Sequence, residues 1–239
     1  MKIYDPIEIV KEKLFPVIKE CLNKNLKSVI IYGSAITDSF DPKISDINVL
    51  VLIDRNSSEL YIELGKKLKN IIKKYKLSIL LLTTEEFINS ADVFPMEYYD
   101  INDRHLVIYG ENIEGKLLLT PHNLRHQLEE RLRGFSNQFR QAIIQSGGNY
   151  KILKQNINII PGIIRILMRS VLRLNGISVK DLSDKMIFPE IEKIYEVKFT
   201  CLSFLTASSG KSKPQDIASA ITGILDILDK IIVKIDDFE

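Results

Sequence analysis

The stretch "IIYGSAITDSFDPKISDINVLVLID", residues 30–54, decides the fold of the first half of the chain. An apolar strand runs to Gly33–Ser34, and a polar loop follows. A second apolar strand then begins, with the polar residues Asp46 and Asn48 at its start. Side chains alternate along a strand, so these two polar residues are predicted to share one face. The second strand is otherwise apolar on both faces, which predicts that both faces are covered.

The residue types at these two points suit the binding of a phosphorylated ligand. Gly33 lets the backbone turn sharply and approach a ligand closely. Ser34 offers a hydroxyl and a backbone N–H at an expected helix start, where phosphate oxygens bind well. Asp46 and Asn48 provide two oxygen donors, and Mg²⁺ takes oxygen ligands and shares the others with substrate phosphates. The stretch therefore predicts a phosphate cradle beside a hard-metal site.

The composition limits the class of protein. The chain has 239 residues, 45% of them hydrophobic, and a formal net charge of +2. A sizeable core can form, and the balanced charge makes a nucleic-acid partner unexpected. No apolar run approaches the roughly 18 residues of a membrane span. The first residues lack the apolar core of a signal peptide, so a soluble, cytoplasmic protein is expected.

The hydrophobic pattern changes along the chain. Short apolar runs predict strands, and apolar residues at helical spacing predict helices between them. The strands are expected at residues 28–33, 47–54, 77–83 and 105–110. Helices are expected at residues 6–24, with a kink or break at Pro16, and at residues 60–75 and from Thr83, whose capping box with Glu86 starts a short helix.

The second half reads as helical throughout. Thr120–Pro121 predicts a helix start, and "SGGN" (146–149) its end. Further helical patterns cover residues 151–175, 183–196, 198–207 and 214–236, with a loop at 208–214. The predicted fold class is therefore α+β, a small mixed sheet in residues 1–118 followed by a helical bundle in residues 119–239.

"GSAITDSFDPKISDIN" resembles the signature of the DNA polymerase beta-type nucleotidyltransferases, which is Gly-Ser, a loop of about this length, an Asp, an apolar residue and a second carboxylate, although this sequence has Asn48 at the last position. The resemblance covers residues 28–110. The helical second half is similar in layout to aminoglycoside nucleotidyltransferases. The resemblance implies transfer of a nucleoside monophosphate from a nucleoside triphosphate, with ATP expected, to a hydroxyl group. It also implies two divalent metal ions, Mg²⁺ or Mn²⁺, as cofactors.

The resemblance also implies roles for residues. Gly33 and Ser34 would hold the triphosphate, and Asp46 would be the first metal ligand. Asn48 stands at the second ligand position, where the family has a carboxylate, and Ser78 stands where a third is expected.

Acidic residues elsewhere can replace the missing carboxylates. Glu97 and Asp100 lie in "DVFPMEYYDINDRH" (92–105), which we expect to be a connection. Tyr98 or Tyr99 in the same segment would stack on a base, or else Phe94 and Tyr98 would seal the edge of the sheet.

Three interpretations stay open. The chain is a working nucleotidyltransferase with relocated carboxylates, or a degenerate one that binds a nucleotide or a protein partner without turnover. In the third, Gly33–Ser34 and Asp46 only cap a helix and a strand. The acceptor stays open as an antibiotic, another small molecule, a protein side chain or an RNA end, with RNA disfavoured by the charge balance. A homodimer through the apolar stripes of the second half is also open.

Two further clusters have a functional and a structural interpretation. His122 and His126, four residues apart with Glu129 and Glu130 one turn on, have a spacing that can hold zinc, but a solvated helix face is favoured. Arg165, Arg169 and Arg173 form one line on a helix. Arg169 would bind the triphosphate if the helical part closes over the first, although ordinary surface charge is the favoured interpretation.

Overall fold

The computed structural model describes residues 4–37, 40–42, 45–157, 159–202 and 213–238. The chain divides into two compact units, Met1–Leu119 and Thr120–Glu239. Each unit has its own core and is described by itself below.

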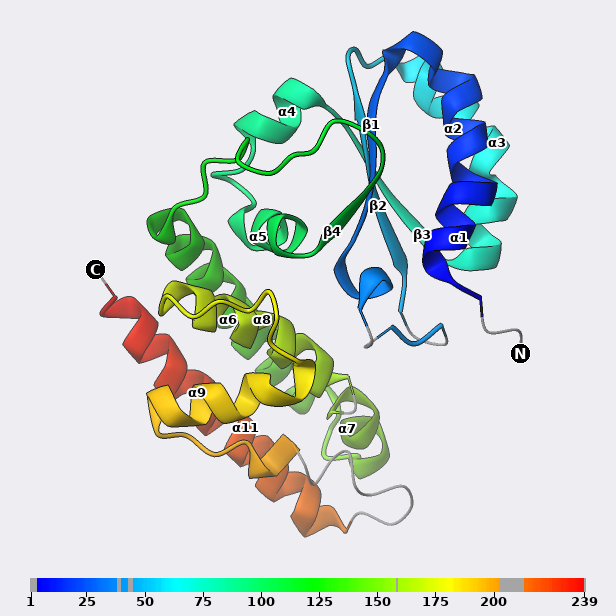
Figure 1. The fold of residues 1–239 in the computed structure, drawn as a ribbon. Coiled ribbons are helices and arrows are strands. Elements are labelled where there is room, and N and C mark those ends of the chain that lie inside the picture. Colours follow the sequence, from blue (N-terminus) through cyan, green and yellow to red (C-terminus); the bar gives the residue numbers. More distant parts are fainter. Residues whose placement is uncertain (1–3, 38–39, 43–44, 158, 203–212, 239) are drawn as a thin grey trace. The chain divides into compact units, whose positions relative to one another are not determined.

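The first unit is built on a four-stranded mixed sheet (Figure 1). Its strands are β1 (Leu26–Tyr32), β2 (Ile47–Ile53), β3 (Leu77–Thr83) and β4 (His105–Gly110). Their order is β3-β2-β1-β4, with β2 parallel to β3 and β1 antiparallel to both β2 and β4. The strands lie where the sequence predicts them, and the predicted α+β class, a small mixed sheet followed by helices, is confirmed.

Helices cover both faces of this sheet, as the two-sided apolar pattern of β2 predicts (Figure 1). One face carries α1 (Pro6–Ile9), the π-helical turn η1 (Val10–Leu14), α2 (Phe15–Leu22) and α3 (Ser58–Tyr75). The other face carries α4 (Thr84–Asn89) and α5 (Pro95–Asp103). Short 3-10 turns occupy Asn23–Asn25 (η2) and Gly33–Ile36 (η3).

Local sequence signals explain most helix boundaries. The predicted helix at residues 6–24 is interrupted by the π-turn just before Pro16, because proline lacks an N–H and its ring displaces the carbonyl four residues earlier. Ser57 caps the start of α3, and the predicted capping box of Thr83 and Glu86 starts α4.

The expectation of a connection at residues 92–105 is wrong, because Pro95–Asp103 forms helix α5. Pro95 stands in the first turn, where its missing N–H costs nothing. The helix buries Tyr98 and Ile101, three residues apart on one face. An apolar face of so few residues gives little helical periodicity in the sequence. The helix is therefore stabilised mainly by its packing on the sheet.

The second unit is entirely helical over the residues that the structure describes. Its elements are α6 (Pro121–Gln145), α7 (Tyr150–Ile157), α8 (Ile160–Leu174), η4 (Asp184–Met186), α9 (Ile187–Tyr195) and α11 (Pro214–Asp236). Helix α6 packs on α8 and α11, and α9 packs on α8. Fully buried residues of this core include Leu128, Leu132, Met168, Leu172 and Leu228.

Helix α6 starts at the predicted point, where the Thr120 hydroxyl accepts the N–H of Asn123 at 3.3 Å. It ends at Gln145, directly before the segment 146–149 that was predicted to end it. The single helix expected at 151–175 is two helices, because Pro161 stands in the first turn of α8. The helix expected at 198–207 and the loop at 208–214 lie mostly outside the described residues.

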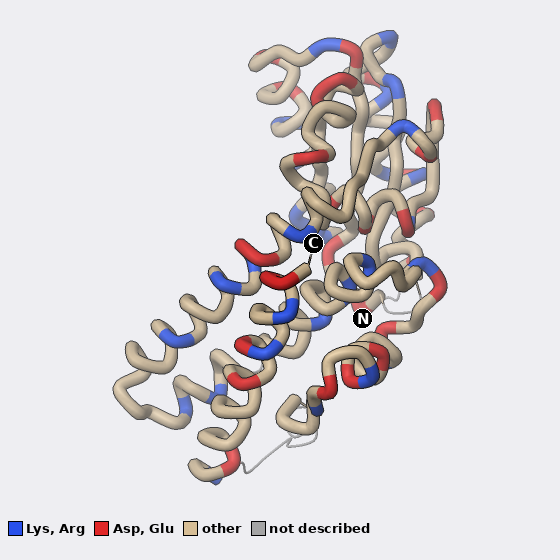
Figure 2. Tube along the Cα trace, turned by 90° about the vertical axis from the view of Figure 1, so that its left-hand side faces the viewer, with Lys and Arg blue, Asp and Glu red and all other residues tan. Residues whose placement is uncertain are grey.

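Charged residues of both signs are interspersed along the helices of each unit (Figure 2), in keeping with the net charge of +2. Within the described ranges, no helix is long and apolar enough to cross a membrane.

Candidate functional site

The bend after β1 requires glycine. Gly33 has a φ of +74°, a conformation that residues with a Cβ rarely adopt. Its N–H donates to the carbonyl of Arg104 at 3.2 Å, which ties the bend to the end of α5. The expected helix after Gly33 is only the 3-10 turn η3, in which the Ser34 carbonyl accepts the N–H of Thr37 at 3.0 Å.

The bend and the beginning of β2 converge. Tyr32, the last residue of β1, pairs with Asn48 in the antiparallel register. A methyl group built on Gly33 would lie 3.3 Å from Nδ2 of Asn48. Asp46 is exposed and directly precedes β2, while Asn48 is half-buried. The structure thus brings the residues of the predicted phosphate cradle next to those of the predicted metal site.

The neighbouring strand adds a neutral residue at the same place. Ser78 of β3 pairs with Asn48 in the parallel register and is exposed. The two positions where the resemblance implies carboxylates therefore lie side by side and hold an amide and a hydroxyl. Neither group supplies the negative charge that a second Mg²⁺ needs.

Helix α5 carries acids over the same face of the sheet. Asn48 lies on the same face of β2 as Leu50 and Leu52, and these leucines share a cluster with Tyr98 and Ile101 of α5. The pKa of the Tyr32 phenol is raised, first by burial and then by the negative charges of Glu97 and Asp100. Both acids therefore act electrostatically on the residue that pairs with Asn48.

The donor set at the strand start fits one magnesium ion better than two. In the part of the chain that the structure describes, no three His, Cys, Asp or Glu side chains are grouped to hold a metal. Asp46 and Asn48 offer one carboxylate and one amide. Such a pair suits a Mg²⁺ that takes its other ligands from water and substrate phosphates. It does not suit the two-ion arrangement that the resemblance implies.

Tyr98 has a structural role. It is 2% exposed and stacks on Phe87 with ring centroids 4.7 Å apart. Its hydroxyl also shares a hydrogen bond of 2.6 Å with the hydroxyl of Ser90. This burial favours the interpretation in which Tyr98 seals the sheet, while Tyr99 is half-buried.

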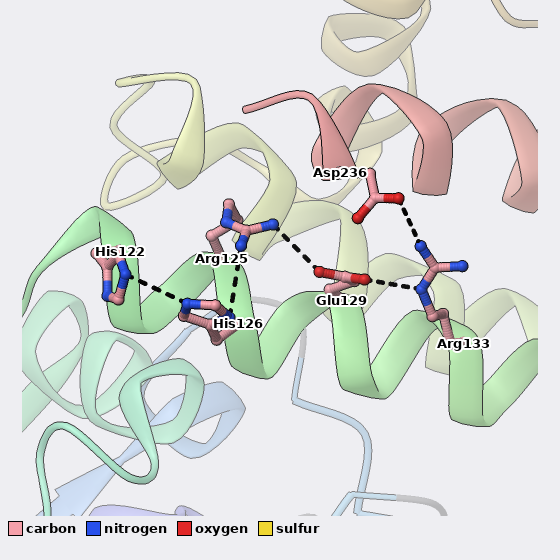
Figure 3. Close-up of polar contacts among 6 residues, drawn as sticks. All are labelled: His122, Arg125, His126, Glu129, Arg133 and Asp236. Carbon is pink, nitrogen blue, oxygen red and sulfur yellow. Dashed lines mark hydrogen bonds and ion pairs between the residues drawn. The ribbon is translucent and has the colours of Figure 1, made fainter. Parts of the chain in front are cut away.

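The histidine pair on α6 is part of a polar row (Figure 3). His122 and His126 lie with their Nε2 atoms 3.2 Å apart, and both are exposed. Glu129 lies further along the helix, where it accepts from Arg125 at 3.1 Å and from Arg133 at 2.8 Å (Figure 3). This arrangement agrees with the favoured interpretation of a solvated helix face.

The arginine line on α8 faces partners within the second unit. Arg169, whose side chain is 16% exposed, forms an ion pair with Asp184 of η4. The guanidinium of Arg165 lies over the ring of Phe188, 5.7 Å from its centroid. The contact of Arg169 with a triphosphate stays a prediction.

Sequence reasoning overlooked Tyr32. Its position at the end of β1 and its pairing with Asn48 put it on the side of the sheet that carries the acids of α5. The available signal was the alternation along β1, because Tyr32 follows Ile30 on that face.

No protein-family model matches the chain, and no curated protein matches it in sequence. Among solved structures, the chain is similar to the crystal structure of spectinomycin adenyltransferase AAD(9) from Enterococcus faecialis with ATP and spectinomycin. The TM-score is 0.61 and the sequence identity 13%, with 95% of this chain and 100% of that chain covered. At this identity the likeness shows a nucleotidyltransferase-like fold and does not extend to substrate or acceptor.

Proposed function

We propose that this protein binds a magnesium–nucleoside triphosphate, with ATP as the expected nucleotide, at the end of β1 and the beginning of β2. We further propose that it transfers the nucleoside monophosphate to a hydroxyl of a small acceptor. The observation that carries the proposal is the contact between the Gly33 bend and Asn48, with the exposed carboxylate of Asp46 beside it. The likeness to an adenyltransferase crystallised with ATP and spectinomycin supports the same class of reaction.

The chain's own residues have distinct tasks in this reaction. The backbone at Gly33 and Ser34 approaches the triphosphate, and Asp46 with Asn48 holds the magnesium. The magnesium supplies positive charge to the phosphate oxygens and the leaving pyrophosphate. The acceptor oxygen bonds to the α-phosphorus as the bond from that phosphorus to the bridging oxygen breaks. Glu97 or Asp100 takes the proton of the acceptor hydroxyl as general base.

A second candidate function is that of a degenerate nucleotidyltransferase, which binds a nucleotide or a protein partner without turnover. The neighbouring Asn48 and Ser78 favour it, because neither carries charge where the resemblance implies carboxylates. A single weakly held cation leaves the pyrophosphate charge less neutralised in the transition state, which slows transfer more than it weakens binding.

Separate measurements of binding and of transfer distinguish the two functions. Mg-ATP and Mn-ATP are titrated by calorimetry, and pyrophosphate release is followed with spectinomycin and other aminoglycosides as trial acceptors. Binding with release supports transfer, and binding without release supports the second function. Absence of both would overturn the nucleotide site itself.

The variant Asp46→Ala tests the metal ligand, with Asp54→Ala as matched control. Asp54 directly follows β2 at its other end, where it is exposed and lies 3.4 Å from Lys27. Asp46→Ala should weaken Mg-ATP binding by about tenfold or more, about 1.4 kcal/mol, while Asp54→Ala should leave it unchanged. An unaltered affinity in Asp46→Ala would reject Asp46 as a ligand.

A further inference from the structure

Strand β3 (Leu77–Thr83) is an edge strand whose own sequence carries none of the residues that commonly protect such an edge. It pairs with β2 on one side, and among the described residues no strand pairs with its other side. Its sequence "LSILLLT" holds no charge and no proline, and its register with β2 runs without a bulge. Natural edge strands are commonly blunted by one of these devices, because their outer N–H and C=O groups offer a template for another strand.

An apolar surface adjoins this edge. A groove of about 210 Å³ runs between α3 and β3, and Tyr61, Gly65, Ile79 and Leu81 are among its lining residues. Tyr61 of this lining is 42% exposed, so the groove reaches the surface at an apolar side chain. Exposed hydrophobic residues are normally scattered singly, whereas apolar surface that is gathered in one place marks a site of interaction.

The two ends of β3 carry opposite charges. Lys73, Lys74 and Lys76 precede the strand, while Glu85 and Glu86 follow it. When two such strands pair antiparallel, the basic end of one meets the acidic end of the other. A second copy of this chain therefore presents complementary charge at both ends of the pairing, and an arbitrary peptide does not.

We propose that two copies of this protein associate through β3, with their β3 strands antiparallel about a two-fold axis near Leu80. The two four-stranded sheets then form one continuous sheet, and Lys76 of each copy lies near Glu85 of the other. Such a contact uses the same surface on both copies, so it closes as a dimer and leaves no further β3 edge for growth. The proposal concerns assembly alone and holds or fails independently of the nucleotide site.

Sedimentation velocity of the full chain tests the proposal directly. The expected result is a species of about twice the 27.4 kDa chain mass, in equilibrium with monomer and favoured at low salt. A chain that stays monomeric at every accessible concentration overturns the proposal. A dimer whose dissociation constant does not change when the charges at the ends of β3 are altered overturns it as well.

Charge reversal identifies the surface. Glu85→Lys and Lys76→Glu should each weaken dimerisation by about tenfold, and the double variant should restore it, because each pair of opposite charges is re-formed. Glu114→Lys is the matched control, since this exposed acid follows β4 at the opposite edge of the sheet. Two weakened single variants without recovery in the double variant overturn the proposed antiparallel register.

Amide hydrogen exchange gives a second readout that needs no variant. The outward-facing amides of residues 77–83 should exchange more slowly at high than at low protein concentration, because they gain hydrogen bonds only in the dimer. A dimer in which exchange of these amides is independent of concentration uses another surface and overturns the proposal.

Discussion

The two faces of the sheet in the first unit are built from the same strands but differ in composition. The face under α1, α2 and α3 is apolar along the whole of β2, and Ile47, Val49 and Val51 are all buried there. The face under α4 and α5 is equally buried at Leu50 but becomes polar at Asn48, where β2 begins. A strand with one closed face and one face that opens at its end can serve as scaffold and as binding site at once.

The difference shows how few residues of β2 the proposed site would use. Strand alternation assigns every second residue to each face, so one polar residue at the strand start alters only the site face. The first face keeps its hydrophobic packing and fixes β2 in place. Substitutions on the two faces should therefore differ in their effects on stability and on nucleotide binding.

The largest effect is expected in the core, where the two faces should be equivalent. Ile30 and Ile31 are neighbours on β1, are both 0% exposed, and point to opposite faces. Replacement of either by Ala should lower the free energy of unfolding by about 2–5 kcal/mol, through lost burial and the cavity that remains. Urea denaturation measures both variants. A much smaller loss for Ile30→Ala than for Ile31→Ala would mean that α4 and α5 do not bury their face of the sheet as fully as α1, α2 and α3 bury theirs.

The next effect concerns the polar end of the second face. Asn48→Asp should strengthen Mg-ATP binding by about tenfold, about 1.4 kcal/mol, because it restores a negative charge beside Asp46. Calorimetric titration measures the change, and Ser78→Ala serves as a control that adds no charge. Affinity that stays flat or drops in Asn48→Asp would show that this side chain does not face the metal.

Replacement of glycine by alanine should have opposite effects on stability at the bend after β1 and within helix α3. Gly33→Ala should destabilise the protein by about 1 kcal/mol, because Gly33 has a positive φ. Gly65 lies within α3 and has open space around it, so Gly65→Ala should stabilise the protein by up to about 1 kcal/mol. Thermal or urea unfolding of the two variants should give opposite signs. Equal signs would remove the argument that the bend at Gly33 requires glycine.

The smallest effect is the response of Tyr32 to the acids of α5. Its pKa is raised above 10.0 in the folded protein, by burial first and by Glu97 and Asp100 next. The folded state therefore holds this proton more tightly than the unfolded state. The resulting stability is complete below the unfolded pKa of about 10 and is lost as pH rises through the folded pKa.

Removing the acids should lower that pKa without restoring the ordinary value, since burial remains. The double variant Glu97→Gln with Asp100→Asn can be followed by NMR of labelled tyrosine, with Tyr32→Phe to assign the signal. Tyr195 is the internal control, because burial raises its pKa and no acid contributes. A pKa of Tyr32 that does not move would show that α5 does not bring these acids near the site.

Much of the first unit could be predicted from the sequence because its signals are local. The strands, the turn at Gly33 and the Thr83–Glu86 capping box each depend on neighbouring residues, and the structure shows all of them. Helix α5 could not be predicted this way, because its few buried residues form no clear helical pattern. They are buried only because the helix packs on the sheet. The interruption before α8 was missed despite Pro161, whose place in the first turn of that helix is a local signal.

The sequence by itself determined that Gly33 turns, that Asp46 and Asn48 stand at the start of a buried strand, and that a helical unit follows. Only the tertiary structure decided that Gly33 lies against Asn48, that Ser78 stands beside it, and that the acids of α5 are near enough to raise the pKa of Tyr32. The reason is physical. Backbone preference acts over a few residues, whereas strand pairing and helix packing join positions far apart in the chain and depend on the burial of the whole sheet.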